Sequence, residues 1–287
     1  MLSKLFFLAI AVLVLMSMAC GLTINLPVDN IQTGPTRTKE IFVEQPDDAE
    51  VDLTLAFAAG QLNLSGGAEG AVIEGQAVYN IDDLEPNIVV NNAKIRIETG
   101  DRDFKGLPKF GDDIRNEWDL KLGTMPMDLV VNAGAYQGDF DLGGLALKSL
   151  EVSDGAADVR LRFSEPNLIE MDMLRYITGA SNVRLTGLAN ANFSSMIFRS
   201  GAGDYTLDFS GDLERDADVK IESGISQVTL KIPEGTNAVV YFTGGLANVD
   251  VEGTWTMSGN QYTLDGEGPQ LTIHVEIGAG NLRLETD

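Results

Sequence analysis

The chain has 287 residues, of which 44% are hydrophobic and 22% are charged, so it is long and apolar enough to build a sizeable core. Its formal net charge of −23 argues against nucleic-acid binding, because phosphate backbones repel so acidic a surface. A single Cys excludes an internal disulfide and cysteine-ligated zinc or iron–sulfur clusters, and a single His removes most imidazole chemistry. The sequence therefore predicts neither a metal site nor a cofactor.

The first twenty residues have the pattern of a secretion signal. Lys4 precedes an apolar run over 5–16, which is followed by Ser17-Met18-Ala19 and Cys20. Signal peptides have apolar cores of about 7–15 residues, whereas membrane spans need about 20. The stretch resembles a bacterial lipobox, although Ser17 and Met18 depart from its usual residues. We expect a lipoprotein signal peptide over 1–19 and a lipid on Cys20 that anchors the protein to a membrane on the extracytoplasmic side. The alternatives are an uncleaved anchor and an unlipidated secreted form.

The rest of the chain indicates a tether followed by strands. Residues 20–45 are polar and rich in Thr, Asn and Pro, which is typical of a linker. From residue 46 onward, alternation of period two is interrupted by Gly, Asn and Asp, and no long amphipathic helix occurs. We expect an N-terminal β module over 46–118 and a repeat β-solenoid over 119–287. The stretch 99–118 carries charges of both signs and is predicted to be a solvated surface loop.

Eight segments of the chain share one template. With Val219 as position 0, apolar or small residues fall at positions 0, 2, 4 and 6 and again at 9, 11 and 13. The other seven segments begin at Leu53, Leu129, Leu150, Leu174, Met196, Val240 and Ile273. Position 5 is Gly in every copy except the one with Ala58, and position 8 is always a side-chain amide or carboxylate. This pattern predicts an all-β stacked-coil solenoid of about eight strand–Gly corner–strand repeats, with an antiparallel β-sandwich as the rival.

The template also predicts where each coil bends. Side chains alternate along a strand, so the odd step from position 6 to position 9 requires a bend, which we place at positions 7 and 8. Gly at position 5 would allow the backbone torsions of the bend, and the frequent Ala at position 6 would line its inside. Residues 129–252 are expected to form consecutive parallel coils, with the position-8 side chains aligned as a ladder.

Charges on the outward positions support this stacking. The column at position 12 alternates in sign without like-charge neighbours: Asp141, Arg162, Thr186, Asp208, Lys231 and Glu252. Position 10 disagrees, because it places Arg160 beside Arg184. Either nearby acids screen these two cations, or Arg160, Arg162 and Arg184 together form an anion-binding spot.

Two further features carry side chains with candidate roles. The interval between Gly245 and Gly278 is 33 residues, against 21 to 24 between the other glycines, and its Gly259-Asn260 centre predicts a hairpin. Trp255 and Tyr262 in this hairpin could contact a sugar or peptide, or they could cover the end of the stack. His274 falls at an outward position and is expected to be a solvated strand residue. A calcium site at 200–204 is disfavoured, because calcium-binding β-rolls repeat every nine residues.

The strand–Gly–Ala–strand segments, among them LDFSGDLERDADVKIESGISQVTLKI and the closing LTIHVEIGAGNLRLE, resemble the bacterial toast-rack family. They are also similar to the C-terminal module of LiaF-like cell-wall-active antibiotic response proteins and to related adhesins. The segment VDLTLAFAAGQLNLSGGAEGAVIEGQAVYNI over 51–81 resembles the N-terminal toast-rack module. The resemblance implies a stacked β architecture and a cell-envelope location. It supplies no catalytic residue.

Three classes of function follow from these patterns. We favour a lipid-anchored envelope protein that binds a cell-wall glycan or an envelope protein in an adhesion, scaffolding or stress-sensing role, without catalysis. A polysaccharide-active enzyme is the second class, although no constellation of acid, base and metal is visible. A passive structural spacer is the third. Any ligand is expected on outer strand faces rather than in a deep pocket.

Overall fold

The computed structural model describes residues 33–99 and 114–286, which form one 15-stranded sheet and two short 3-10 turns. The expected signal peptide, Cys20, the first part of the tether and most of the 99–118 loop lie outside the described residues. Where they are described, the expected tether is wrong over 37–44 and the expected loop is wrong over 116–118, because both stretches are strands of the sheet. The strands are β1 (Arg37–Glu44), β2 (Val51–Gly66), β3 (Ala71–Tyr79), β4 (Pro86–Asn91), β5 (Lys94–Thr99), β6 (Asn116–Leu122), β7 (Met127–Asp141), β8 (Leu147–Arg162), β9 (Met171–Thr186), β10 (Phe193–Asp208), β11 (Ala217–Lys231), β12 (Thr236–Glu252), β13 (Thr256–Ser258), β14 (Gln261–Leu264) and β15 (Glu267–Glu285). The 3-10 turns are η1 (Asp82–Leu84) and η2 (Leu188–Ala191). Over the described ranges, no helix is long and apolar enough to cross a bilayer.

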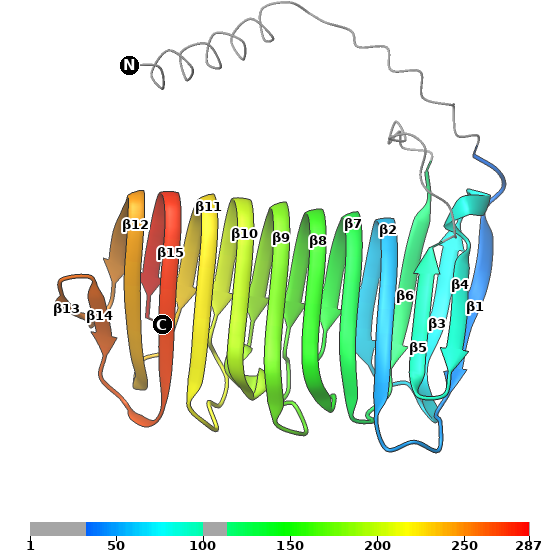
Figure 1. Cartoon of the computed structure of the whole chain (residues 1–287), viewed down its shortest axis with the longest axis horizontal. Coiled ribbons are helices and arrows are strands. Elements are labelled where there is room, and N and C mark those ends of the chain that lie inside the picture. The colour runs from blue at the N-terminus through cyan, green and yellow to red at the C-terminus, as the bar shows by residue number, and fades with distance from the viewer. Residues whose placement is uncertain (1–32, 100–113, 287) are drawn as a thin grey trace, which may run out of the picture. The chain divides into compact units, whose positions relative to one another are not determined.

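The eight predicted repeats are the eight long strands, β2, β7 to β12 and β15. Each strand rises through one layer, bends over a common edge and descends through a second layer (Figure 1). Neighbouring long strands are parallel and match position for position, as where Leu129 lies between Leu53 and Leu150. The stacked-coil, toast-rack-like β-solenoid expected from the sequence is therefore confirmed, and the rival antiparallel sandwich is wrong. We call the layer of first halves the first layer and that of second halves the second layer.

The hydrophobic core fills the space between the two layers. In β8, Leu150 and Val152 point inward from the first layer, and Val159 and Leu161 from the second, and each is at most 1% exposed. The same positions are buried in the neighbouring coils, so each coil packs on the next. Each fully buried side chain of this kind stabilises the fold by about 1.5–3 kcal/mol relative to an exposed one.

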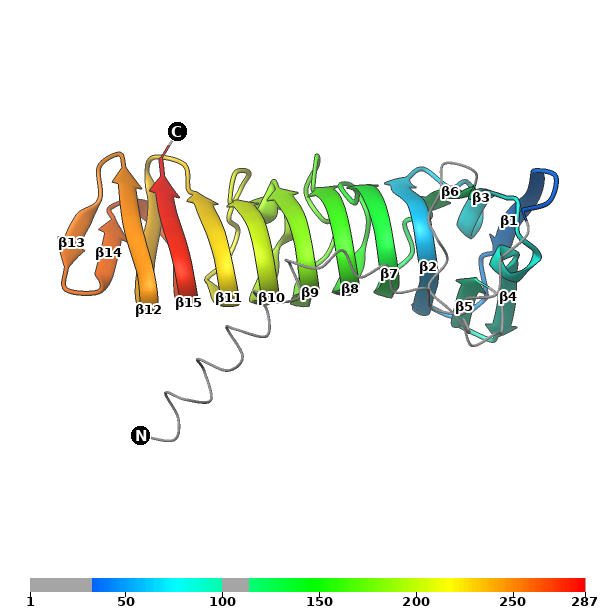
Figure 2. The same cartoon turned by 90° about the horizontal axis from the view of Figure 1, so that it is seen from above.

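At its N-terminal end the stack divides into separate strands. The first half of β2 pairs with β5, which pairs with β4, whereas the second half of β2 pairs with β6. The second layer then continues from β6 to β3 and β1 through antiparallel pairs. Figure 2 shows the two layers parting beyond β2. Strands from both expected segments, 46–118 and 119–287, thus belong to one sheet, joined where β2 pairs with β7.

The expected order of coils is wrong at the C-terminal end. The sheet runs β11–β15–β12, so the last long strand lies between two earlier ones, and the run from 129 to 252 is not consecutive. Glu285 therefore faces Lys231 at 3.1 Å, in the place expected for Glu252. The predicted hairpin exists as β13 and β14, and β14 pairs with the far edge of β12. Because the coils share one template, the template alone did not distinguish which of the last two strands pairs with β11.

The predicted position of the bend is also wrong. Gly155 and Ala156, at positions 5 and 6 of β8, are exposed, while position 7 turns inward, as Tyr136 and Ser181 show. The bend therefore lies at positions 5 and 6, and the position-6 alanines lie on its outside. We call the line of position-5 and position-6 residues along the common edge the ridge, and all of them are Gly or Ala except the exposed Ile225 and Leu246. The odd step in the template required a bend, but it did not determine at which position between 4 and 9 the bend lies.

Close approach of neighbouring backbones explains the ridge glycines. None of those at position 5 has a positive φ, so the expected need for special torsions is wrong. A Cβ on Gly201 would lie 2.6 Å from the Gly179 carbonyl oxygen, and one on Gly224 would lie 2.5 Å from that of Gly201. The single exception, Ala58, belongs to β2, which is the first strand along the stack to cross the ridge. A Cβ is tolerated there because no preceding ridge carbonyl faces it.

Candidate functional site

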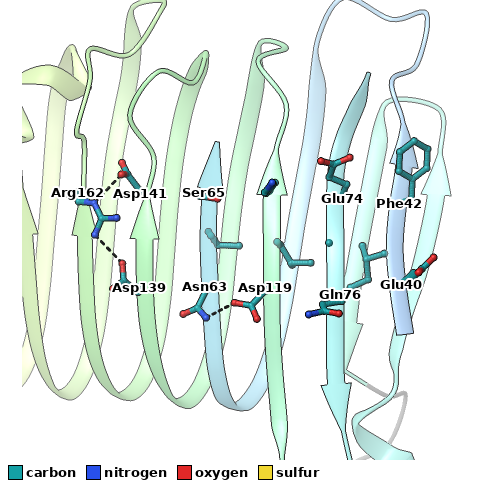
Figure 3. Close-up of a pocket in the computed structure, with 15 residues that line it drawn as sticks. Glu40, Phe42, Asn63, Ser65, Glu74, Gln76, Asp119, Asp139, Asp141 and Arg162 are labelled. Atoms are coloured by element: carbon teal, nitrogen blue, oxygen red, sulfur yellow. Dashed lines mark hydrogen bonds and ion pairs between the residues drawn. The ribbon is translucent and has the colours of Figure 1, made fainter. Parts of the chain in front are cut away.

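An open polar groove crosses the outer face of the second layer at its N-terminal end. It spans β1, β3, β6, β2, β7 and β8, and its volume is about 880 Å³ (Figure 3). Each of these strands turns alternate residues outward, so that buried Ile41 is followed by Phe42, which is 59% exposed. The groove is thus formed by the face of the sheet itself and is shallow.

Register places the outward residues of these strands in two rows. The upper row, named for its place nearer the ridge at the top of Figure 1 and drawn lower in Figure 3, reads Glu40, Gln76, Asp119, Asn63, Asp139 and Arg160 from β1 to β8. The lower row reads Phe42, Glu74, Lys121, Ser65, Asp141 and Arg162. A ligand lying across the strands would meet one side chain of each row at every strand.

Carboxylates outnumber cations in the groove. Five carboxylates line it, against Lys121 and Arg162. The Arg162 guanidinium donates to Asp141 at 2.9 Å and to Asp139 at 3.1 Å, so its charge is taken up within the protein (Figure 3). The Asn63 amide donates to Asp119 Oδ1 at 2.5 Å. The remaining field is negative and favours a cationic or hydroxyl-rich ligand.

Asp141 anchors one wall of the groove. Burial acts to raise its pKa, but hydrogen bonds from Ser164 and Arg162 outweigh burial and hold the pKa below its usual value. The hydrogen bond to Asp141 in turn raises the pKa of Arg162. The pair therefore stays ionised at neutral pH and fixes the β7–β8 edge of the groove.

A smaller depression continues the groove toward the ridge. Its volume is about 260 Å³, and it shares Asn63 and Asp139 with the groove. Gln61 donates to Gln137 across it at 3.4 Å, which is a bonded step of the predicted position-8 ladder. Asp158 and Arg160 line its far side.

The three arginines of the predicted anion-binding spot have different surroundings. Arg160 and Arg184 are exposed register neighbours, and neither forms an ion pair within the described ranges. Arg162 is held by Asp139 and Asp141. Arg160 and Arg184 thus remain available to an anion, whereas Arg162 is already neutralised. Binding of an anion there stays a prediction.

The predicted aromatic contacts lie on the C-terminal hairpin. Tyr262 sits opposite Val240 on the edge of β12, and both Trp255 and Tyr262 are half-buried against the core. They cover the end of the stack, and their role as a ligand platform stays a prediction. His274 is exposed, as expected, and its ring stacks on Tyr241 with centroids 5.0 Å apart. In the described parts of the chain, no three His, Cys, Asp or Glu side chains are arranged to hold a metal ion.

Sequence reasoning missed a polar cluster beneath the ridge. Asp154 accepts hydrogen bonds from Tyr176 at 2.7 Å, from Tyr136 at 3.4 Å, and from Thr178 and Ser181. Burial raises the pKa of both tyrosines, so each stays a neutral donor. The available signal was polar residues at two inward positions, Asp and Thr at position 4 and Tyr and Ser at position 7. Because the bend was expected at positions 7 and 8, position 7 was not recognised as inward. The cluster satisfies a carboxylate that would be costly to bury alone.

The fold and its surface define a class of structure, which is a two-layered stack of bent strands with a shallow groove on one outer face and a close-packed interior. The sequence profile of the N-terminal domain of toast_rack, DUF2154, matches residues 32–173 and 166–231, which is more than half of the chain. The chain belongs to the toast-rack family. All the residues of the groove fall within the matched region.

Several solved structures are similar to this chain at low sequence identity. A putative cell adhesion protein from Clostridium sporogenes is 20% identical, with a TM-score of 0.50 and coverage of 88% of this chain and all of the other. A putative adhesin from Bacteroides fragilis is 11% identical, with a TM-score of 0.41 and coverage of 87% and 97%. A putative lipid binding protein from Parabacteroides distasonis is 13% identical, with a TM-score of 0.41 and coverage of 88% and 99%. No curated protein matches the chain in sequence.

Proposed function

We propose that this protein is a non-catalytic binding protein of the cell envelope, anchored on the extracytoplasmic side of a membrane by a lipid on Cys20. It holds a cell-wall glycan or an envelope protein against the outer face of its second layer. Adhesion, scaffolding and envelope-stress sensing all use this one property. The Clostridium sporogenes protein with the same fold carries the name of a putative cell adhesion protein, which agrees with such a role.

The observation that carries the proposal is the groove itself. It is long, shallow and lined by carboxylates and amides from six neighbouring strands, so it fits an extended polar chain better than a compact cofactor. Phe42 adds one exposed aromatic face, which is suited to the apolar face of a sugar or a side chain. The close-packed core leaves the ligand on the outside of the layers.

An enzyme that cleaves polysaccharides is the competing function, because carboxylates line the same groove. A glycosidase needs one carboxylic acid whose pKa is raised, so that it can protonate the leaving group. The lowered pKa of Asp141 makes this one carboxyl unsuited to that role. We assign binding because the groove is open and shallow, and measured turnover of a cell-wall polymer would replace this assignment.

Sedimentation with insoluble cell wall tests the site. Ser65→Trp places an indole in the middle of the groove and should abolish co-sedimentation. Thr186→Trp is the matched control, because Thr186 occupies the same template position on β9, is half-buried like Ser65 and lies outside the groove. Equal binding by the two variants, or no binding by the wild type, would contradict the proposal. Detergent phase partitioning of the wild type and Cys20→Ser tests the anchor, since only the wild type should enter the detergent phase.

A further inference from the structure

The upper row of the groove has a regular alternation of charge. Three carboxylates, Glu40 on β1, Asp119 on β6 and Asp139 on β7, are separated by single amide side chains. These amides are Gln76 on β3 and Asn63 on β2. The next two strands then present Arg160 and Arg184. The row thus reads acid, amide, acid, amide, acid and then two cations.

Strand spacing converts this alternation into a length. Neighbouring strands lie about 4.8 Å apart, so the carboxylates recur about every 9.6 Å across the sheet. An extended peptide presents same-side residues about every 6.8 Å, which does not match that repeat. One pyranose of an extended glycan advances by nearly one strand spacing. A disaccharide repeat therefore matches the distance from one carboxylate to the next.

Resting on the binding function proposed above, we propose that the ligand is a glycan that lies across the strands and carries a free amine on every second sugar. Its ammonium groups face Glu40, Asp119 and Asp139. The intervening sugars, neutral or N-acetylated, face Gln76 and Asn63.

The surroundings of these side chains fit such a ligand. Glu40 forms no ion pair within the described ranges, and Asp119 uses only Oδ1 to accept from Asn63. Asp139 uses only Oδ1 to contact Arg162, so Oδ2 is open to a ligand on this carboxylate too. Exposed Phe42 lies one pleat from Glu40 and can cover the apolar face of a terminal sugar.

The two arginines set the far end of the site. A chain that continued past β7 would bring its next ammonium group to the unpaired cations Arg160 and Arg184, which repel it. The site therefore extends over five strands, from β1 to β7. This length corresponds to five sugars with amines on the first, third and fifth.

Binding to defined oligosaccharides tests the inference, with the full chain purified in detergent. The probes are a pentasaccharide of glucosamine and N-acetylglucosamine in alternation, with glucosamine at both ends, the all-N-acetylglucosamine pentamer and the all-glucosamine pentamer. We expect the alternating probe to bind at least tenfold tighter than the acetylated one and no more weakly than the all-glucosamine one. Asp119→Asn should lower the affinity for the alternating probe about tenfold. Asp265→Asn, which changes an exposed carboxylate outside the groove, should leave that affinity unchanged.

Several results would overturn the inference. Equal affinity for the acetylated and alternating pentamers would show that the amines are not recognised. Tighter binding of the all-glucosamine pentamer would show that general charge attraction, and not the spacing of the amines, determines the affinity. Tighter binding of a pentalysine peptide identifies a basic protein segment as the occupant. In each case, the proposed binding function still holds if the wild type binds whole cell wall and Ser65→Trp abolishes that binding. The two proposals can therefore fail separately.

Discussion

The central coils and the N-terminal end of the stack both enclose a core between two layers, but they form those layers from differently arranged strands. From β7 to β11, each strand belongs to both layers, because its first half lies in the first layer and its second half, beyond the ridge, lies in the second. Both halves stay in register with the neighbouring strands. Beyond β2 the layers are built from separate strands, β5 and β4 in one and β6, β3 and β1 in the other. The cores are equally buried, as Leu120 and Leu161 show.

The difference teaches where variation can be placed in this fold. Within the central coils, an added Cβ on a ridge glycine would clash with the carbonyl oxygen of the preceding one, so the bend leaves no room for a side chain at position 5. At the divided end, each layer ends on its own strands, and those of the second layer supply half of the groove. The ridge therefore constrains the central coils, whereas the strands added at the divided end lie beyond the ridge and are not constrained by it.

The largest expected effect comes from removing an inner strand rather than an edge strand. A chain ending at Leu264 lacks β15, so β11 and β12 lose the partner between them and expose their apolar faces. We expect loss of cooperative unfolding and aggregation. Deleting 33–44 removes β1, which has a partner on one side only, and should leave a folded stack. Circular dichroism and thermal scans separate the two, and similar melting curves would contradict the coil order.

A charge in the core of a central coil should have the next largest effect. Ile221→Asp buries an unpaired carboxylate at a site with no exposed area and should lower the free energy of unfolding by several kcal/mol. The adjacent Lys220→Asp changes an exposed residue paired with Glu222 and should cost under about 1 kcal/mol. Urea unfolding of both variants measures the difference. Equal losses would mean that the inward and outward positions are exchanged.

The ridge can be tested at its two kinds of residue. Gly201→Ala forces a Cβ against the Gly179 carbonyl and should cost about 1–3 kcal/mol, the range for overpacking. Ala58→Gly, at the first coil, should cost under about 1 kcal/mol, since only backbone entropy and one methyl group change. Chemical unfolding provides both values. A tolerated Ala at 201 would show that adjacent coils separate more easily than the structure indicates.

The smallest effect concerns the ion pair at the edge of the groove. Because the pKa of Asp141 is lowered in the folded protein, its stabilisation is present above the unfolded pKa of about 3.9 and is lost as the pH falls through the folded pKa. Arg162→Gln should raise the pKa of Asp141 and reduce stability at pH 7 by under about 1 kcal/mol, since both side chains are partly exposed. Carboxyl NMR titration measures the shift. An unchanged pKa in the variant would show that Ser164 and the backbone suffice.

The sequence predicted the repeat well because the repeat is local. Each template copy carries its own periodicity and its own Gly, so the register of Leu129 against Leu150 follows from aligning the copies. The position of β15 did not follow, because the segments that begin at Val240 and Ile273 both fit the template and the template does not say which of them lies beside β11. The 33-residue interval was the available sign of this exchange.

The groove was not predicted, for a different reason. Glu40, Glu74 and Asp119 lie on strands that lack the template, and their antiparallel pairing depends on contacts distant in sequence. The alternation of each strand indicates an outward face, but it does not say which strand lies beside which. The groove residues on the template strands β2, β7 and β8 were easier to predict, and the template already placed Asp141 beside Arg162 at position 12.

The position of β15 also has a consequence for synthesis. A ribosome releases β11 and β12 before β15 exists, so a nascent chain cannot extend the stack one coil at a time through this point. If β12 docked directly on β11, it would satisfy the shared template and occupy the place that β15 takes in the finished fold. Correct folding therefore requires that the place beside β11 is empty, or is vacated by β12, when β15 arrives. Premature docking of β12 is the misfolding route that this topology creates.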